Sequence, residues 1–384
     1  MIQNNLILLF VLTVFVITFY KYFPKIINKY NTSLLIDDQF KKPQAFHTAP
    51  VSTTGGLGLF LAFSILCIYF FASAKTVYLE YFLFCALFFL LGFSDDLKLN
   101  IRPKFRLIIM MLLLIFLIIF NKLYILNTGI EFLNRFLEID IFSLFFISIC
   151  FLFIINGSNL IDGYNGLLGI HALIILINLC LINYTNGNND LAFFILSGVL
   201  ILSIFLKYNF PKAVIFLGDG GSYFLGAFIA LSVIKTSIAN PSVSPFYFCI
   251  LLFYLFFEVF FSFIRKVFIE RKSPLFPDKK HLHMLIYKSF VKKYKNKVKS
   301  NYYVSILINS IFLLMTVPAI FMKENGLFCK YYSILFFLFY LSSYKMLYEK
   351  KKWENSITGG TDHINHKITN IFIKKIIILI LKGR

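Results

Sequence analysis

The feature that most constrains this chain is a series of long apolar runs separated by short polar connections. A run of about 20 apolar residues is long enough to cross a bilayer as a helix. Hydrophobic residues make up 59% of the chain, which leaves too little polar surface for a water-soluble protein. We therefore predict an all-α, polytopic integral membrane protein with about 11 transmembrane helices. The runs are 6–20, 57–74, 77–93, 105–120, 139–155, 167–183, 191–206, 221–234, 246–264, 302–321 and 331–347.

Basic residues fall mostly on one side of this topology, which predicts its orientation. One set of connections holds 32 of the 38 Lys and Arg residues. Because cytoplasmic loops are enriched in Lys and Arg, we place this set in the cytoplasm and the N-terminus outside. The net charge of +20 then reflects topology and anionic headgroups, so we expect no nucleic-acid partner. The set consists of 21–54, 94–106, 157–166, 207–219, 265–301 and the tail from 345.

The chain divides into a transmembrane domain, 1–347, and a basic cytoplasmic tail, 348–384. The last apolar run of the tail is about ten residues, too short to span a bilayer. We expect an amphipathic helix at the membrane interface there, with a disordered tail as the alternative. Segment 123–137 is too polar to span.

Five polar clusters lie on the predicted cytoplasmic side. Polar groups at a membrane boundary are costly unless they line a wet cavity or bind something, although a simple turn is the alternative. Their common side predicts one composite site. The clusters are H-T-A-P-V-S-T-T-G-G at 47–56, G-F-S-D-D-L-K-L-N at 92–100, N-G-S-N-L-I-D-G-Y-N-G-L at 156–167, F-L-G-D-G-G-S at 216–222, and S-P-L-F-P-D-K-K-H-L-H at 273–283.

The adjacent carboxylates Asp95 and Asp96 repel each other and need a cation at a membrane boundary. A divalent metal would serve, because hard cations prefer carboxylate oxygens and magnesium is often shared with phosphates. A solvated helix end is the alternative. The basic residues that follow would also serve: Lys98, Arg102, Lys104 and Arg106.

Asp219 lies in a glycine-rich turn before a predicted helix. The glycines allow close backbone approach, and a helix N-terminus attracts anions. An ordinary N-cap role for Asp219 is the alternative.

His281 and His283 follow Lys279 and Lys280. This spacing is weak as a metal site, but it suits a cationic loop that contacts phosphate. Glu258, inside an apolar run, needs a partner, and Arg265 is two helical turns further along the same face.

The polar clusters sit at one membrane edge and not near the bilayer midplane, where transporters bind their substrates. This favours an enzyme that works at the cytoplasmic interface on a lipid and a water-soluble anion.

In their order, the five clusters make the chain resemble the polyprenyl-phosphate N-acetylhexosamine-1-phosphate transferases of glycosyltransferase family 4, over roughly residues 40–285. The loop that carries His281 and His283 and the first cluster look most like the branch that initiates O-antigen and enterobacterial common antigen. The resemblance implies a Mg²⁺ cofactor, with Mn²⁺ as an alternative, held by Asp219, Asp95 and Asp96. It implies catalytic roles for these three aspartates and for His281 and His283. Substrate binding is then assigned to Asn156, Asn159, Asp162, Asn165, Lys104, Arg106, His47, Glu258, Arg265, Lys279 and Lys280.

The resemblance also implies the reaction and the partners. A polyprenyl phosphate would attack the β-phosphorus of a UDP-N-acetylhexosamine, directly or through a covalent Asp intermediate, and UMP would leave. The partners would be the UDP-sugar, the lipid and the membrane, and a homodimer is compatible with them. The expected location is the bacterial inner membrane, with the active site on its cytoplasmic face.

Two departures from the family pattern keep other functions open. Asn165 stands where the family usually has Asp, and Met284 stands where a third histidine is common. The alternatives are the peptidoglycan-branch phospho-MurNAc-pentapeptide transferase and an inactive scaffold of a glycan assembly complex.

Overall fold

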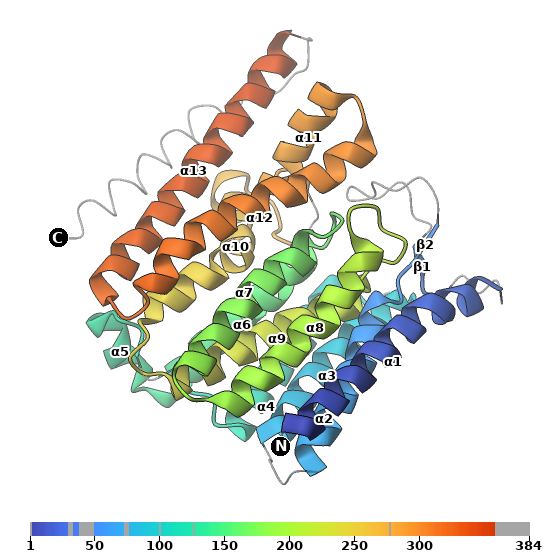
Figure 1. The fold of residues 1–384 in the computed structure, drawn as a ribbon. Coiled ribbons are helices and arrows are strands. Elements are labelled where there is room, and N and C mark those ends of the chain that lie inside the picture. The colour runs from blue at the N-terminus through green and yellow to red at the C-terminus, as the bar shows by residue number, and fades with distance from the viewer. Residues whose placement is uncertain are drawn as a thin grey trace.

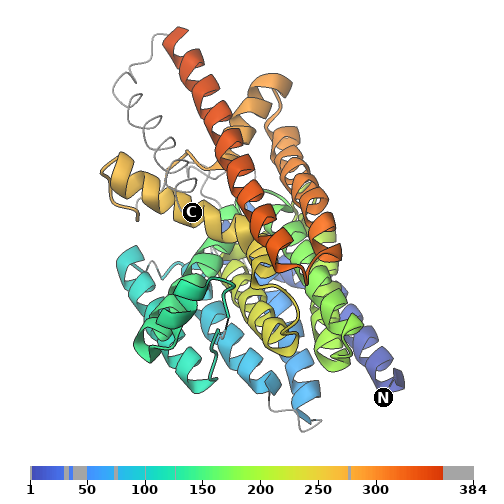
Figure 2. The same cartoon turned by 90° about the vertical axis from the view of Figure 1, so that its left-hand side faces the viewer.

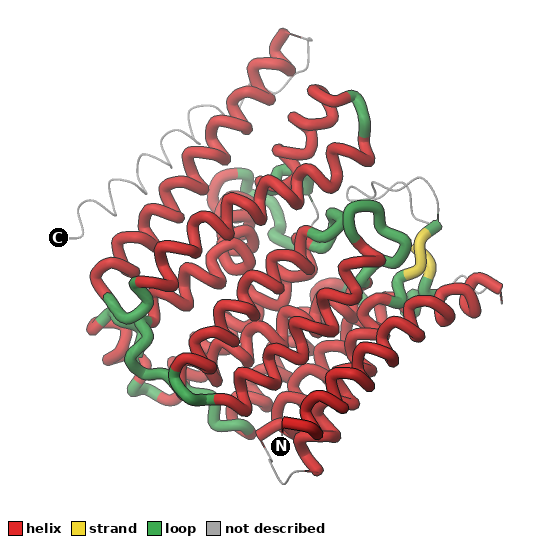
Figure 3. The backbone as a smooth tube through the Cα atoms, viewed as in Figure 1, coloured by secondary structure: helices red, strands yellow, loops and turns green. Residues whose placement is uncertain are grey.

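The computed structural model describes residues 2–29, 34–37, 50–72, 77–99, 101–125, 127–275 and 278–357, and helices dominate it (Figures 1 and 3). A two-stranded antiparallel hairpin pairs β1 (Ile36–Asp37) with β2 (Val51–Ser52). The helices are α1 (Ile2–Lys29), α2 (Gly55–Ala72), α3 (Val77–Asp96), α4 (Pro103–Phe120), α5 (Glu131–Leu137), α6 (Asp140–Ile161), α7 (Leu167–Thr185), α8 (Asn189–Asn209), α9 (Gly218–Ala239), α10 (Pro245–Ile264), the π-helix η1 (Arg265–Ile269), α11 (Leu282–Tyr294), α12 (Lys297–Phe321) and α13 (Gly326–Ile357).

Eleven helices in the described ranges are long and apolar enough to cross a membrane. They are α1 to α4, α6 to α10, α12 and α13, and each overlaps one of the predicted apolar runs. The prediction of an all-α, multi-pass membrane protein is confirmed. The seven-residue helix α5 falls within 123–137, the segment predicted not to span.

Residues 265–301 differ from the expected long connection, because most of them are helical. They contain η1, α11 and the first turn of α12. At the other end of the domain, α13 continues to Ile357, beyond the predicted limit at 347. The rest of the tail, 358–384, lies outside the described residues, so its interfacial helix stays a prediction.

Helix α9 lies at the centre of the bundle, packed against α2, α3, α6 and α7. Helix α10 packs against α6 on one side and against α12 and α13 on the other (Figure 2). Large apolar side chains on the outer helices are exposed, among them Phe10, Leu112, Leu314 and Tyr331. Such a surface is stable when lipid surrounds it.

Glycines let α2 and α3 approach the start of α9 backbone to backbone. A Cβ atom on Gly56 would lie 2.3 Å from Cα of Gly221, and one on Gly92 would lie 2.3 Å from the carbonyl oxygen of Asp219. Any larger residue would push these helices apart. The contact at Gly92 brings the end of α3, with its two aspartates, onto the start of α9.

Backbone hydrogen bonds join the first polar cluster to the fourth. The amide of Phe216 donates to the carbonyl of Ser52 at 2.8 Å, and the amide of Gly55 donates to the carbonyl of Phe216 at 3.0 Å. The two clusters are more than 150 residues apart in the sequence and lie side by side in the fold. His47, the predicted substrate residue of the first cluster, is outside the described residues.

Candidate active site

Asp96 joins the end of α3 to the start of α9. Its Oδ1 accepts from the amide of Asp219 and its Oδ2 accepts from the amide of Gly220, both at 2.9 Å. The first amides of a helix lack partners within the helix, and they favour a negative charge. Gly218, with φ of +80°, makes the tight turn that exposes them. Asp96 therefore has a structural role in addition to its predicted role at the metal, which stays a prediction.

Arg106 of α4 is the cation that meets the acidic residues. It pairs with Asp95, and its Nη1 lies 3.9 Å from Oδ2 of Asp219. The side chain of Asp219 is 43% exposed, whereas that of Asp95 is 14% exposed. Asp219 is thus the carboxylate most open to a ligand. The sequence offered four cations as partners for these aspartates, and Arg106 is the one that contacts Asp95 and Asp219. The side chain of Lys104 is exposed.

Asp162, at the C-terminal end of α6, completes the acidic group. Burial raises the pKa of its carboxyl, and the charges of Asp219 and Asp96 raise it further. The carboxylates of Asp96 at the end of α3 and Asp219 at the start of α9 are therefore close enough to Asp162 to disfavour its negative charge. We call Asp95, Asp96, Asp162 and Asp219 the acidic cluster.

The turn that follows Asp162 is anchored at Asn165 and Gly166. The amide of Asn165 donates to Oδ1 of Asn301 at 2.8 Å, and its Nδ2 donates to the carbonyl of Pro211 at 3.0 Å. The amide of Gly166 donates to Oδ1 of Asn209 at 2.8 Å. A carboxylate at position 165 could not donate to Pro211. This departure from the family pattern therefore has a structural use here.

Asn156, predicted to bind substrate, bonds within its own helix instead. Its Nδ2 donates to the carbonyl of Leu152 at 2.8 Å. Asn159, one turn later on α6, is half-buried. Substrate contact by these two residues stays a prediction.

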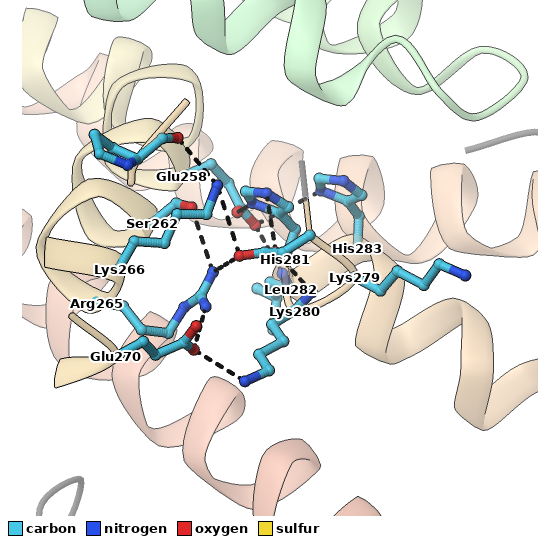
Figure 4. Close-up of polar contacts among 12 residues, drawn as sticks. Glu258, Ser262, Arg265, Lys266, Glu270, Lys279, Lys280, His281, Leu282 and His283 are labelled. Carbon is cyan, nitrogen blue, oxygen red and sulfur yellow. Dashed lines mark hydrogen bonds and ion pairs between the residues drawn. The ribbon is translucent and has the colours of Figure 1, made fainter. Parts of the chain in front are cut away.

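His281 and His283 lie side by side against Glu258 of α10 (Figure 4). Their rings are parallel to within 5°, with centroids 5.5 Å apart. Nδ1 of His281 lies 3.1 Å from Oε2 of Glu258, and Nδ1 of His283 lies 3.7 Å from Oε1. The amide of Leu282 also donates to Oε1, at 3.1 Å. His281 has extended backbone and directly precedes α11, which lets both rings face the same carboxylate.

Glu258 and Arg265 do not pair with each other, contrary to the relation that their spacing suggested. The guanidinium of Arg265 instead bonds Glu270 and Asp278, at 2.7 Å each. Lys280 bonds Glu270 at 3.0 Å. Helical spacing predicted that Arg265 shares a helix face with Glu258. The residues that follow η1 supply closer carboxylates, those of Glu270 and Asp278. Figure 4 shows this network around the guanidinium.

Two acidic residues of this region, Glu270 and Asp278, were missed by sequence reasoning. Burial opposes the ionisation of Asp278, but Arg265 and His281 lower its pKa to about 2. The sequence feature that could have identified them is their position within a strongly basic stretch, where an acidic residue is expected to pair with a neighbouring cation. We call Glu258, Arg265, Glu270, Asp278, Lys280, His281 and His283 the histidine cluster; the side chain of Lys279 is exposed.

Tyr164 connects the two clusters. Its ring centroid lies 5.5 Å from that of His283 and 5.4 Å from that of Tyr287 on α11. Tyr164 is two residues from Asp162, so one short turn touches both the acidic cluster and the histidine cluster. The fold thus brings residues of the second, third, fourth and fifth sequence clusters to one end of the helix bundle.

The acidic cluster suits a divalent cation in its chemistry. In the described part of the chain, no group of three His, Cys, Asp or Glu residues is placed to hold a metal ion. Magnesium, however, commonly uses one or two carboxylates and completes its shell with water and substrate phosphates. Asp95 and Asp219 already converge on one positive group, Arg106, and they fit that pattern.

The fold and this site define a multi-pass membrane protein with a charged site at one end of its helices. Residues 78–237 match the family Glycosyl transferase family 4. This segment is a Glycosyl transferase family 4 domain, and it contains α4 to α8 and nearly all of α3 and α9. The acidic cluster lies within that segment and the histidine cluster lies beyond it.

Curated relatives agree with this assignment. Over 242 residues the chain is 29% identical to an undecaprenyl-phosphate alpha-N-acetylglucosaminyl 1-phosphate transferase of Thermotoga maritima, covering 62% of this chain and 68% of the relative. It is 30% identical to a phospho-N-acetylmuramoyl-pentapeptide-transferase of Caldicellulosiruptor bescii, covering 46% and 58%. It is 32% identical to the transferase of that name from Dictyoglomus turgidum, covering 50% and 61%. The chain therefore spans 58% to 68% of the length of these relatives.

Proposed function

We propose that this protein transfers an N-acetylhexosamine-1-phosphate from a UDP-sugar to a polyprenyl phosphate such as undecaprenyl phosphate. UMP is released, and the product is the first lipid-linked intermediate of a cell-surface polysaccharide. The observation that carries the proposal is the junction at Tyr164, where an acidic cluster with an open Asp219 adjoins a histidine cluster. The family and the names of the relatives support the same class of reaction.

The chemistry required is phosphoryl transfer between two anions. An oxygen of the lipid phosphate forms a bond to the β-phosphorus of the UDP-sugar while the bond to the UMP oxygen breaks. Catalysis then consists of positioning and charge neutralisation. Arg106 beside the acidic cluster and Lys280 in the histidine cluster supply fixed positive charge.

Mg²⁺ is the proposed cofactor, with Mn²⁺ as a substitute, and Asp95 and Asp219 would hold it. When bound, it would neutralise phosphate charge during transfer. We expect EDTA to abolish UMP release and added Mg²⁺ to restore it. Full turnover in EDTA would contradict the metal assignment.

The proposed location follows from the pattern of basic residues in the connections. The active site faces the cytoplasm at the bacterial inner membrane, where UDP-sugars are made, and the N-terminus lies outside. The proposed pathway is the O-antigen or enterobacterial common antigen type. The relatives from C. bescii and D. turgidum favour phospho-MurNAc-pentapeptide transfer as the second candidate.

The deciding experiment measures UMP release by the purified full chain from a panel of UDP-sugars with undecaprenyl phosphate. UDP-N-acetylhexosamines should react, and UDP-MurNAc-pentapeptide should not. The reverse result would favour the second candidate, and no release from any donor would support an inactive scaffold. The control variant is Glu131→Gln, which removes an exposed carboxylate on α5 outside both clusters.

A further inference from the structure

His283 has one ring nitrogen with a partner and one without. Its side chain is 0% exposed, and within the described ranges Nε2 makes no hydrogen bond. Nδ1, in contrast, lies 3.3 Å from the hydroxyl of Tyr254 and 3.7 Å from Oε1 of Glu258. A buried polar atom without a partner destabilises the folded state, which favours a role in binding.

His281, its neighbour, is held on both sides. Nδ1 lies 3.1 Å from Oε2 of Glu258, and Nε2 lies 3.6 Å from Oδ1 of Asp278. Both nitrogens of His281 therefore face carboxylates that belong to the protein. Of the two histidines, only His283 keeps a nitrogen that a ligand could use.

The position of the proton on His283 decides what that nitrogen can do. Burial lowers the pKa of His283, although Glu258 acts in the opposite direction, so the imidazole is neutral near pH 7. A neutral imidazole has one N–H, and the partner of the other nitrogen determines which one carries it. Glu258 alone would draw the proton to Nδ1, because a carboxylate only accepts. A hydroxyl that donates to Nδ1 would keep the proton on Nε2.

We propose that Tyr254 is a positioning residue that donates to Nδ1 of His283 and thereby keeps its proton on Nε2, where it can bond an anionic oxygen of the substrate diphosphate. Tyr254 lies one helical turn before Glu258 on α10, so both approach the same edge of the ring. Its own ring is packed against His171, with centroids 5.5 Å apart, which holds the hydroxyl in place. This inference rests on the proposed function.

The surroundings of His283 contain other groups that influence its charge. Tyr254 and Glu258 face it from α10, and Tyr164 faces it from the turn after α6. His281 and Asp278 act on it from the preceding loop. Tyr164 packs edge-on against the ring of His283 and belongs to the turn that carries Asp162, so a ligand bound between the clusters would lie beside His283.

The test is the pH dependence of UMP release by Tyr254→Phe. At about pH 8 we expect turnover to fall on the order of tenfold, as for other residues that orient a histidine. The loss should shrink once the pH falls below the lowered pKa of His283, because an imidazolium carries N–H on both nitrogens. A purely structural role would give the same loss at every pH, and this result would overturn the proposal.

Tyr247→Phe is the matched control. Tyr247 lies on the same helix, is also buried, and its hydroxyl donates to Oδ1 of Asn178 at 2.9 Å, outside both clusters. It should change neither turnover nor its pH dependence. A pH-dependent loss in this control equal to that of Tyr254→Phe would also overturn the proposal.

A second background makes the test specific to His283. In His283→Gln, the amide supplies an N–H close to the position of Nε2, and it does not depend on a tautomer. Tyr254→Phe should then cause no further loss of turnover. A tenfold further loss in this background would show that Tyr254 acts through another group.

A binding measurement separates this inference from the proposed function. If no UDP-sugar releases UMP, the proposed function fails, and the same variants are titrated with inorganic diphosphate by calorimetry. We expect Tyr254→Phe to bind several-fold more weakly than the unmodified chain at about pH 8, and equally at a second pH below the lowered pKa of His283. Equal affinities at both values would overturn the role of Tyr254.

Discussion

The acidic cluster and the histidine cluster adjoin each other but balance their charges in opposite ways. In the acidic cluster, Arg106 contacts Asp95 and Asp219, and the side chain of Asp219 is 43% exposed. In the histidine cluster, Arg265 is 5% exposed and each of its neighbouring carboxylates has at least one cationic partner. The exposed carboxylate at the first site is accessible to a ligand. Compensated, buried charge at the second keeps a loop in one conformation.

The comparison predicts that substitutions in the acidic cluster affect turnover more than stability. The largest effect is expected for Asp219→Asn, which removes the most exposed carboxylate. We expect turnover to fall on the order of 10²- to 10³-fold, by analogy with the loss of another group that stabilises transition-state charge. The melting temperature in detergent should change little, because the carboxylate is exposed and like charges surround it. A large drop in melting temperature, with activity per folded molecule equal to that of the unmodified chain, would reverse this interpretation.

Substitutions in the histidine cluster should instead lower stability. Asp278→Asn leaves Arg265 with one carboxylate partner, and breaking a buried ion pair costs on the order of 3–5 kcal/mol. Asp278 is partly accessible, so we expect the lower end of this range, measured by chemical unfolding in detergent. The matched control is Glu131→Gln, which breaks the exposed pair with Arg135 and should cost less than about 1 kcal/mol. Equal losses in the two variants would remove the distinction between the clusters.

The same pair predicts a pH dependence of stability. The pKa of Asp278 is lowered to about 2, below its usual value of about 4 in an unfolded chain. A lowered pKa stabilises the folded state above the unfolded pKa, and this contribution is lost as pH falls from about 4 to about 2. The stability of the unmodified chain should therefore fall in that window by on the order of 2 kcal/mol more than that of Asp278→Asn. Parallel curves for the two proteins would contradict the assignment.

The smallest effect concerns the turn between the clusters. Asn165→Asp restores the usual residue of the family but removes the bond to Pro211. We expect a loss of about 1 kcal/mol in stability, the usual value of one hydrogen bond, and a change in turnover of less than about tenfold. Asn188→Asp, at an exposed turn on the opposite end of the bundle, is the control. A gain in turnover of more than about tenfold would mean that position 165 acts on the substrate and not on the turn.

The sequence by itself determined the number of spans and the class of the fold. Runs such as 167–183 are local and long, and a bilayer leaves a helix as the only structure that satisfies their backbone. The glycine-rich turn at Asp219 and the adjacent Asp95 and Asp96 were also recognisable, because unusual polar residues at a membrane edge stand out against apolar surroundings. The five clusters and their order were sufficient to indicate the family.

Only the tertiary structure decided which side chains are partners. Four cations follow Asp96 in the sequence, and Arg106 is the one that α4 turns towards Asp95. Asp96 caps α9, 123 residues away, and Arg265 pairs with Asp278 and not with Glu258. These choices depend on how each helix is rotated and how closely the backbones approach, as at Gly92 against Asp219. Such distances arise from packing between elements far apart in the chain, and spacing within one element does not contain them.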